Sequence, residues 1–110
     1  MSTFFVSIGV EEAIKLINER ILSGSTTGEC INSYKLDSPH GGTCIVRVYE
    51  KYYFRAYARL TATVTVDDFE GKTRVHTVVG GGAGMIRGDF GASSSFSNTV
   101  YEALSQYIIL

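Results

Sequence analysis

An unbroken alternation from Tyr53 to Asp67 constrains the fold more than any other feature of this sequence. Apolar side chains, most of them small or β-branched, occupy every second position: Phe54, Ala56, Ala58, Leu60, Ala62, Val64 and Val66. The positions between them hold Tyr53, Arg55, Tyr57, Arg59, Thr61, Thr63 and Thr65. Successive side chains of a strand point to opposite faces. The pattern therefore predicts a sheet with one face packed against helices and one face open to solvent.

The residues before this alternation predict a strand, a helix and a hairpin. A short apolar strand over Phe4–Ile8 precedes a helix over Val10–Leu22. The helix carries an apolar stripe at helical spacing, formed by Val10, Ala13, Ile14, Ile17 and Ile21. Two strands follow, Glu29–Leu36 and Thr43–Glu50, and the turn Pro39–Gly42 joins them.

The chain must reverse between Thr43 and Val66, because a single strand of that length would extend about 80 Å. No Gly or Pro marks the reversal. Glu50–Tyr52 is the first choice, and Arg55–Tyr57 is the second. A plainer turn lies at Asp67–Lys72, where Gly71 suits a positive φ. A four-residue loop there pairs Val66 with Thr73, Val64 with Val75, Ala62 with Thr77 and Leu60 with Val79.

The last third of the chain combines a glycine block with a second helix. Gly80–Gly91 holds six glycines, with Met85–Arg87 as an optional short strand. An apolar stripe then runs to the C-terminus: Phe96, Val100, Ala103, Leu104, Tyr107 and Ile108. The sequence predicts an α+β fold in one domain over residues 1–110. We expect an antiparallel sheet of about five strands with two helices on one face, in the order β-α-β-β-β-β-(β)-α.

The sequence also resembles an uncharacterised family of small bacterial proteins that carries only a domain-of-unknown-function label. The resemblance rests on Cys44–Glu50, Arg59–Val66, the glycine block and Phe90-Gly91. It spans nearly the whole chain, and its motifs belong to the fold rather than to a catalytic site. It implies one compact domain and supplies no activity, cofactor or site residues.

Composition and charge narrow the classes of function. The chain is 45% hydrophobic with a formal net charge of −1, so no overall field favours nucleic acid or an anionic membrane. Met1–Phe5 lacks the basic start of a signal peptide. No apolar run approaches the roughly 20 residues that span a bilayer. We expect a soluble cytoplasmic protein of bacterial type.

The two cysteines, Cys30 and Cys44, fit a reducing compartment. A hairpin centred on Ser38–Gly41 places Lys35 opposite Cys44 and Cys30 opposite Tyr49. The thiols would then lie more than about 15 Å apart at about 3.3 Å per residue, which is too far for a disulfide. Both are predicted to be buried free thiols.

Motifs for catalysis, cofactors or metals are missing. The glycine block does not fit G-x-G-x-x-G, and Gly71-Lys72-Thr73 lacks the first glycine of a phosphate loop. The two histidines and two cysteines lack metal-ligand spacing. His40 lies in a turn, and His76 is predicted on the open face opposite Thr63. We therefore predict no enzyme activity, no catalytic residue, no cofactor and no metal site.

The open face carries the candidate interaction residues. In the predicted register it gathers Arg47, Tyr49, Tyr53, Arg55, Tyr57, Arg59, Arg74 and His76. Tyr and Arg are enriched at protein interfaces and their hot spots, and they also stack on nucleotides. An ordinary solvated sheet would use the same residue types. The sequence thus favours a non-catalytic interaction module that forms a homo-oligomer. A binding domain for a small anionic or nucleotide-like ligand is the alternative.

Overall fold

The computed structural model describes residues 2–54, 57–81 and 91–110. They form β1 (Ser2–Val6), α1 (Val10–Ser23), β2 (Glu29–Asp37), β3 (Thr43–Tyr53), β4 (Ala58–Asp67), β5 (Thr73–Gly80), α2 (Ala92–Ala103), a 3₁₀ turn (Ser105–Tyr107) and β6 (Ile108–Ile109).

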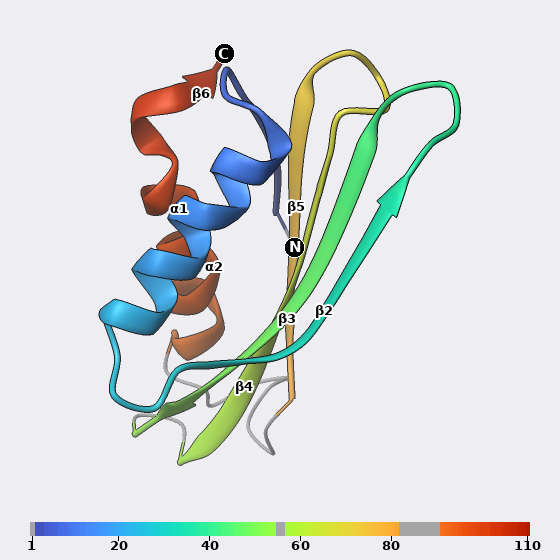
Figure 1. The fold of residues 1–110 in the computed structure, drawn as a ribbon. Coiled ribbons are helices and arrows are strands. Elements are labelled where there is room, and N and C mark those ends of the chain that lie inside the picture. Colours follow the sequence, from blue (N-terminus) through green and yellow to red (C-terminus); the bar gives the residue numbers. More distant parts are fainter. Residues whose placement is uncertain (1, 55–56, 82–90) are drawn as a thin grey trace.

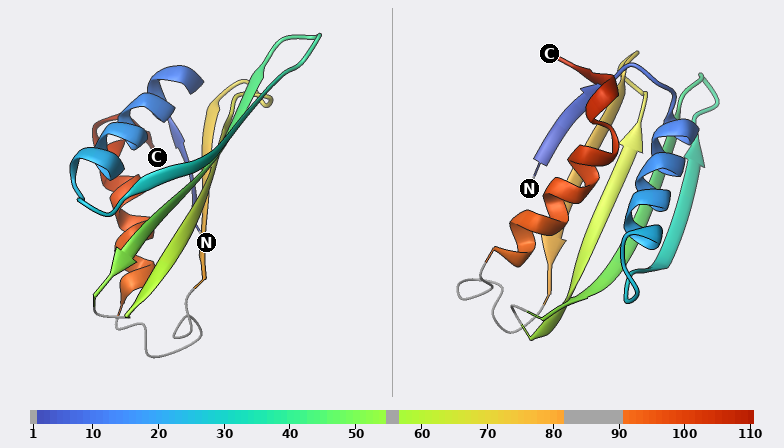
Figure 2. Two further views of the ribbon diagram at one scale, coloured as in Figure 1. Left: turned by 60° about the horizontal axis from the view of Figure 1, so that its bottom comes forward. Right: turned by 90° about the vertical axis from the view of Figure 1, so that its left-hand side faces the viewer.

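The described strands make one antiparallel sheet, and both helices cover the same face of it (Figure 1). The strand order is β2-β3-β4-β5-β1-β6. Figure 2 shows α1 and α2 side by side over the sheet, with the opposite face uncovered. The predicted α+β class and the predicted element order are confirmed. The optional strand at 85–87 lies outside the described residues.

The core lies between the two helices and the sheet, as the apolar patterns predicted. All five members of the predicted α1 stripe are buried: Val10, Ala13, Ile14, Ile17 and Ile21. They meet the buried side chains of β4 and β5: Leu60, Ala62, Val64, Val66 and Val75. The helix begins after Gly9 and ends at Gly24. The amphipathic spacing thus determines which side of α1 faces the sheet.

The chain reverses between Tyr53 and Ala58, so the first choice of Glu50–Tyr52 was wrong and the second, near Arg55–Tyr57, was nearly right. Tyr53 pairs with Ala58, and Tyr49 pairs with Ala62. An even number of residues separates each pair. Odd-numbered side chains of β3 therefore share a face with even-numbered side chains of β4. This change of parity moves Tyr49 and Tyr53 beneath the helices and leaves Tyr52 on the open face.

The β4–β5 hairpin has the predicted faces but a different register. Val66 pairs with Val75, and Val64 pairs with Thr77, whereas the predicted partners were Thr73 and Val75. The slip is two residues, because the turn is centred one residue further along the chain than predicted, between Glu70 and Gly71. Gly71 takes the expected positive φ of 89°. A shift by two residues leaves every side chain on its original face, so the face assignment survived the error.

The C-terminal helix is shorter than predicted. α2 ends at Ala103, and the predicted stripe continues through a 3₁₀ turn into β6. Phe96, Val100 and Leu104 are buried as predicted. Ile108 and Ile109 instead pair with Val6 and Phe5 of β1. This pairing adds a sixth strand and covers what would otherwise be a free edge of β1.

The two cysteines differ in exposure, contrary to the prediction that both are buried. Cys30 pairs with Tyr49 as predicted, but Cys44 pairs with Leu36 rather than Lys35. A β-bulge between Cys30 and Asn32 shifts the register by one residue. Both thiols are free; Cys30 is exposed and Cys44 is buried. Burial and the nearby Asp67 raise the pKa of the Cys44 thiol.

We expect Cys30 to react with a thiol reagent in the native protein and Cys44 to react only after unfolding. The thiolate is the reactive species, and the Cys44 thiol is both shielded and hard to ionise. Mass spectrometry after timed labelling checks this prediction. Equal native rates for both cysteines would contradict it, and so would an intact mass that is lower by two hydrogens.

Candidate interaction surface

The open face of the sheet carries an uncharged area at its centre. Two rows of residues, paired across neighbouring strands, cross it. We call these rows the central patch: Asn32, Val48, Thr63 and Val78 in one row, and Tyr34, Val46, Thr65, His76 and Thr3 in the other. Tyr34 is 57% exposed and Val78 is 43% exposed. The patch joins apolar and hydroxyl-bearing side chains without a carboxylate, a lysine or an arginine.

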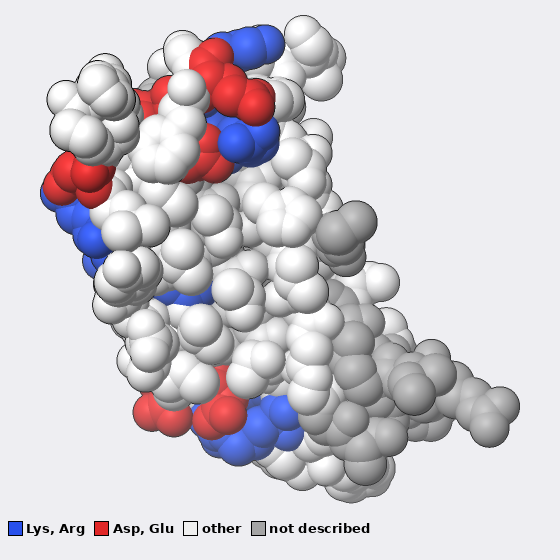
Figure 3. Space-filling model, turned by 90° about the vertical axis from the view of Figure 1, so that its right-hand side faces the viewer, with Lys and Arg blue, Asp and Glu red and all other residues white. Residues whose placement is uncertain are grey.

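Charged side chains of the open face lie beyond the two rows, and they pair with one another. Near one end, Arg59 Nε lies 2.7 Å from a carboxylate oxygen of Glu50 and Arg59 Nη2 lies 3.5 Å from one of Glu29. Near the other end, Arg74 pairs with Asp67 at 3.1 Å and with Glu70 at 3.0 Å. Figure 3 shows the charged side chains gathered toward the two ends of this face and a mainly uncharged middle.

Three of the predicted interaction residues lie on the helix-covered face instead. Tyr49 is fully buried, and its hydroxyl donates to Asn18 Oδ1 of α1 at 3.0 Å. Arg47 Nη1 donates to the same oxygen at 3.2 Å. Tyr53 is buried against the ring of Phe96, with centroids 5.6 Å apart. The prediction was wrong for these three because the β3–β4 turn switches parity.

The remaining predicted residues divide between the turn and the open face. Arg55 lies outside the described residues. Tyr57 lies in the β3–β4 turn, 83% exposed and with a positive φ of 50°. Arg59, Arg74 and His76 do lie on the open face. Both arginines are held in intramolecular ion pairs, so they offer less free charge than the sequence suggested.

His76 lies within the central patch rather than beside a catalytic group. It pairs with Thr65 and not with the predicted Thr63. On its other side, its Nδ1 is hydrogen-bonded to Thr3 Oγ1 at 2.7 Å. Its row neighbours are therefore hydroxyl groups. The predicted solvated strand histidine is consistent with these contacts.

A shallow hollow of about 350 Å³ borders the central patch. It is lined by Thr3, Thr65, Asp67, Arg74 and His76. The hollow lies over β1, β4 and β5, whereas the protruding Tyr34 lies on β2 in the same row. A projection and a recess thus occupy opposite sides of one surface.

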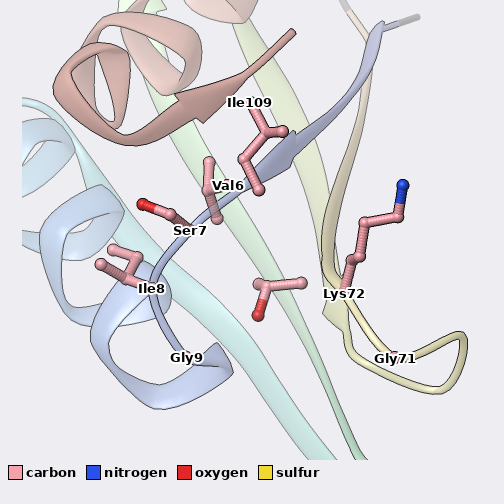
Figure 4. Close-up of a pocket in the computed structure, with 8 residues that line it drawn as sticks. Val6, Ser7, Ile8, Gly9, Gly71, Lys72 and Ile109 are labelled. Atoms are coloured by element: carbon pink, nitrogen blue, oxygen red, sulfur yellow. The ribbon is translucent and has the colours of Figure 1, made fainter.

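A second hollow, of about 420 Å³, lies beside the start of α1 (Figure 4). Val6–Gly9, Gly71–Thr73 and Ile109 line it. The Lys72 side chain points away from Gly9 in Figure 4, and its ammonium lies 4.8 Å from the centroid of the Phe5 ring. Glu11 and Glu12 occupy the first turn of the helix. These carboxylates disfavour an anion at the helix terminus.

Sequence reasoning missed the apolar members of the central patch, above all Tyr34, Val46, Val48 and Val78. The predicted face was assembled from Tyr and Arg residues, but those it took from β3 lie on the helix-covered face, whereas Arg59 of β4 lies on the open face. The missed signal is the alternation of Asn32, Tyr34 and Leu36 with Ser33 and Lys35 in β2. Here the larger apolar side chains take the positions that face solvent, which reverses the usual pattern.

Comparison with known protein families gives a match that covers nearly the whole chain. The model of DUF6054, a family of unknown function, matches residues 1–108. The chain belongs to this family. The resemblance drawn from the sequence motifs is thereby confirmed. Neither the curated proteins nor the solved structures gave a match. Among the described residues, no helix has the length and apolar character needed to cross a membrane.

Proposed function

We propose that this DUF6054 protein is a non-catalytic interaction module whose copies associate through the central patch. One observation carries the proposal: the open face is uncharged across two full rows, while its charged groups pair with one another at the ends. Burying charge at an interface costs desolvation energy. A second copy can cover this patch without desolvating an unpaired carboxylate or ammonium group.

The shape of the patch supports a two-fold arrangement of two sheets packed face to face. A two-fold axis along β4 would place β2 of one copy over β1 of the other, because these strands lie on opposite sides of β4. Tyr34 of one copy would then enter the hollow beside Thr3 and His76 of its partner. Such self-complementarity is what an isologous interface requires.

The size of the face suits a stable dimer. The sheet from β2 to β1 contains five strands, which makes it about 24 Å wide at about 4.8 Å per strand. Seven residues of each of β2 to β5, about 23 Å long, and the five residues of β1, about 17 Å long, cover roughly 520 Å² of flat area. The corrugated accessible surface is larger, and standard interfaces bury about 800 Å² per partner.

Chemical considerations favour this proposal over catalysis or an anionic ligand. Burial keeps the Cys44 thiol in its protonated form, which is a poor nucleophile. His76 is engaged with Thr3. A nucleotide-like ligand would need free cationic groups, and Arg59 and Arg74 of the open face are already paired with carboxylates.

Thr63→Arg should break association through this face. Thr63 lies on β4 between Val48 and Val78, so a two-fold axis along β4 brings the two introduced guanidinium groups together. Its side chain points away from the core, so the fold should persist. We expect association to weaken at least about 100-fold, since like charges facing each other cost several kcal/mol. Sedimentation velocity over a concentration series measures this change.

Asn98→Arg on the exposed side of α2 is the matched control and should leave association unchanged. Circular dichroism of both variants confirms that they are folded. A wild-type protein that stays monomeric at millimolar concentration would refute the proposal in favour of an ordinary solvated sheet. Association that Thr63→Arg leaves wholly unchanged would move the interface away from the central patch.

A further inference from the structure

The β2 strand forms a long edge of the sheet. It pairs with β3 on one side, and no described strand lies on its other side (Figure 2). All nine residues of β2 are exposed. In an antiparallel strand, alternate residues direct their N–H and C=O groups away from the existing partner. The outer side of β2 therefore presents hydrogen-bonding groups that another strand can pair with.

Arg47 of β3 lies beside this edge without a carboxylate partner among the described residues. Its Nε donates to Ser33 Oγ of β2 at 3.1 Å, and its Nη1 donates to Asn18 Oδ1 at 3.2 Å. The other described arginines all form ion pairs. Neutral partners, with the Tyr49 hydroxyl among them, thus hold the guanidinium in place, and its remaining N–H groups are available to an anion.

We infer that two copies of the chain also join edge to edge, pairing β2 with β2 in antiparallel fashion. The strand that pairs with the outer side of β2 is thus β2 of a second copy. One register gives favourable side-chain contacts on both faces of the strand. In this register Lys35 lies on the two-fold axis. Tyr34 then lies opposite Leu36 of the other copy, and Ser33 lies opposite its Asp37. The result is one continuous sheet across two chains.

Both kinds of contact in this register are self-complementary. On the open face, Tyr34 and Leu36 are 57% and 44% exposed. The two-fold axis would create two equivalent contacts, each between Tyr34 of one copy and Leu36 of the other. On the helix side, Asp37 would meet the guanidinium of Arg47, which extends over the small Ser33. Thr43 Oγ1 donates to Asp37 Oδ1 at 2.8 Å, which fixes the carboxylate beside the edge.

Neighbouring registers lack this match. Moving the axis to Tyr34 places Lys35 opposite Ser33, so that the ammonium of the other copy's Lys35 approaches each Arg47 guanidinium. Moving it to Leu36 places Lys35 opposite Asp37, but it leaves only three paired residues within β2 and leaves Arg47 without an anion. In the favoured register the two Lys35 side chains do meet on the axis. Each is paired with Glu11 of its own chain at 2.8 Å, which offsets their repulsion.

A charge exchange between two variants tests the edge. In Asp37→Lys, a lysine would meet Arg47 of the partner, and in Arg47→Glu a glutamate would meet its Asp37. Each variant alone should lose edge association at least about 10-fold. An equimolar mixture should restore it, because each unlike pair is then attractive. Native mass spectrometry separates the mixed species from the two pure ones. Glu12→Lys, an exposed reversal on α1, is the control and should not exchange partners selectively.

The wild-type protein provides a second test that needs no substitution. Edge pairing should slow hydrogen exchange at alternate amides of Ser33–Asp37 as the protein concentration rises, and association through the central patch alone would not. A mixture without selective pairing, together with concentration-independent exchange in β2, would overturn the inference. The two proposed interfaces can be tested independently of each other. Thr63→Arg should leave the slowed exchange of β2 intact, whereas Asp37→Lys should leave the central patch associated.

Discussion

Leu60→Ala should lower the free energy of unfolding by about 2–5 kcal/mol. Leu60 is fully buried, in the middle of the core between β4 and the helices. The substitution removes apolar surface from the core and leaves a cavity that the surrounding helices and strands fill only in part. Urea unfolding followed by circular dichroism, at a concentration where association is constant, measures the change.

Leu110→Ala is the matched control, because Leu110 is the fully exposed last residue. It should change the free energy of unfolding by less than about 0.5 kcal/mol. If Leu60→Ala cost as little as this control, the assignment of even-numbered β4 residues to the helix-covered face would be wrong. The assignment of the central patch to the open face would then also be wrong, since it depends on the same alternation in β4.

Phe96→Ala should destabilise the fold by about 3–5 kcal/mol. Phe96 is fully buried, and its ring contacts that of Tyr53 with centroids 5.6 Å apart. This contact ties the first turns of α2 to the far end of β3, so its loss should loosen helix and hairpin together. Thermal unfolding with amide exchange at β3 reports both effects.

Phe54→Ala provides the comparison for this second substitution. Phe54 lies next to Tyr53 in the chain but is 75% exposed in the turn. The same truncation there should cost less than about 0.5 kcal/mol. Equal losses in the free energy of unfolding for Phe54→Ala and Phe96→Ala would show that Tyr53 does not face α2. The corrected parity of β3 would then be wrong.

Much of the fold was predictable because buried apolar residues repeat with the period of their element. The α1 stripe from Val10 to Ile21 identified the helix and its buried side together. Alternation in β4 identified the strand and its two faces. Registers were less predictable, since they depend on loop lengths. The Cys30–Asn32 bulge and a one-residue displacement of the β4–β5 turn each shifted a pairing without leaving a clear mark in the sequence.

The interaction surface was harder to predict, because residue type was a poor guide to position. Tyr49 and Arg47 resemble interface residues in sequence, yet Asn18 of α1 binds both. Whether Arg59 and Arg74 are free or paired depends on carboxylates brought in from other strands and the β4–β5 loop. Those contacts follow from register. The wrong parity of the β3–β4 pairing therefore changed the predicted surface from uncharged to cationic and aromatic.

An isotope-filtered NOE experiment on an equimolar mixture of ¹³C-labelled and unlabelled chains tests the central claim most directly. It detects only contacts between copies. With the two-fold axis along β4, Val48 methyl groups of one copy should contact Val78 methyl groups of the other, since these residues flank Thr63 on opposite sides. Intermolecular signals between these methyl groups are the predicted result. Their absence at millimolar concentration, or intermolecular signals confined to β2 or the helices, would contradict association through the central patch.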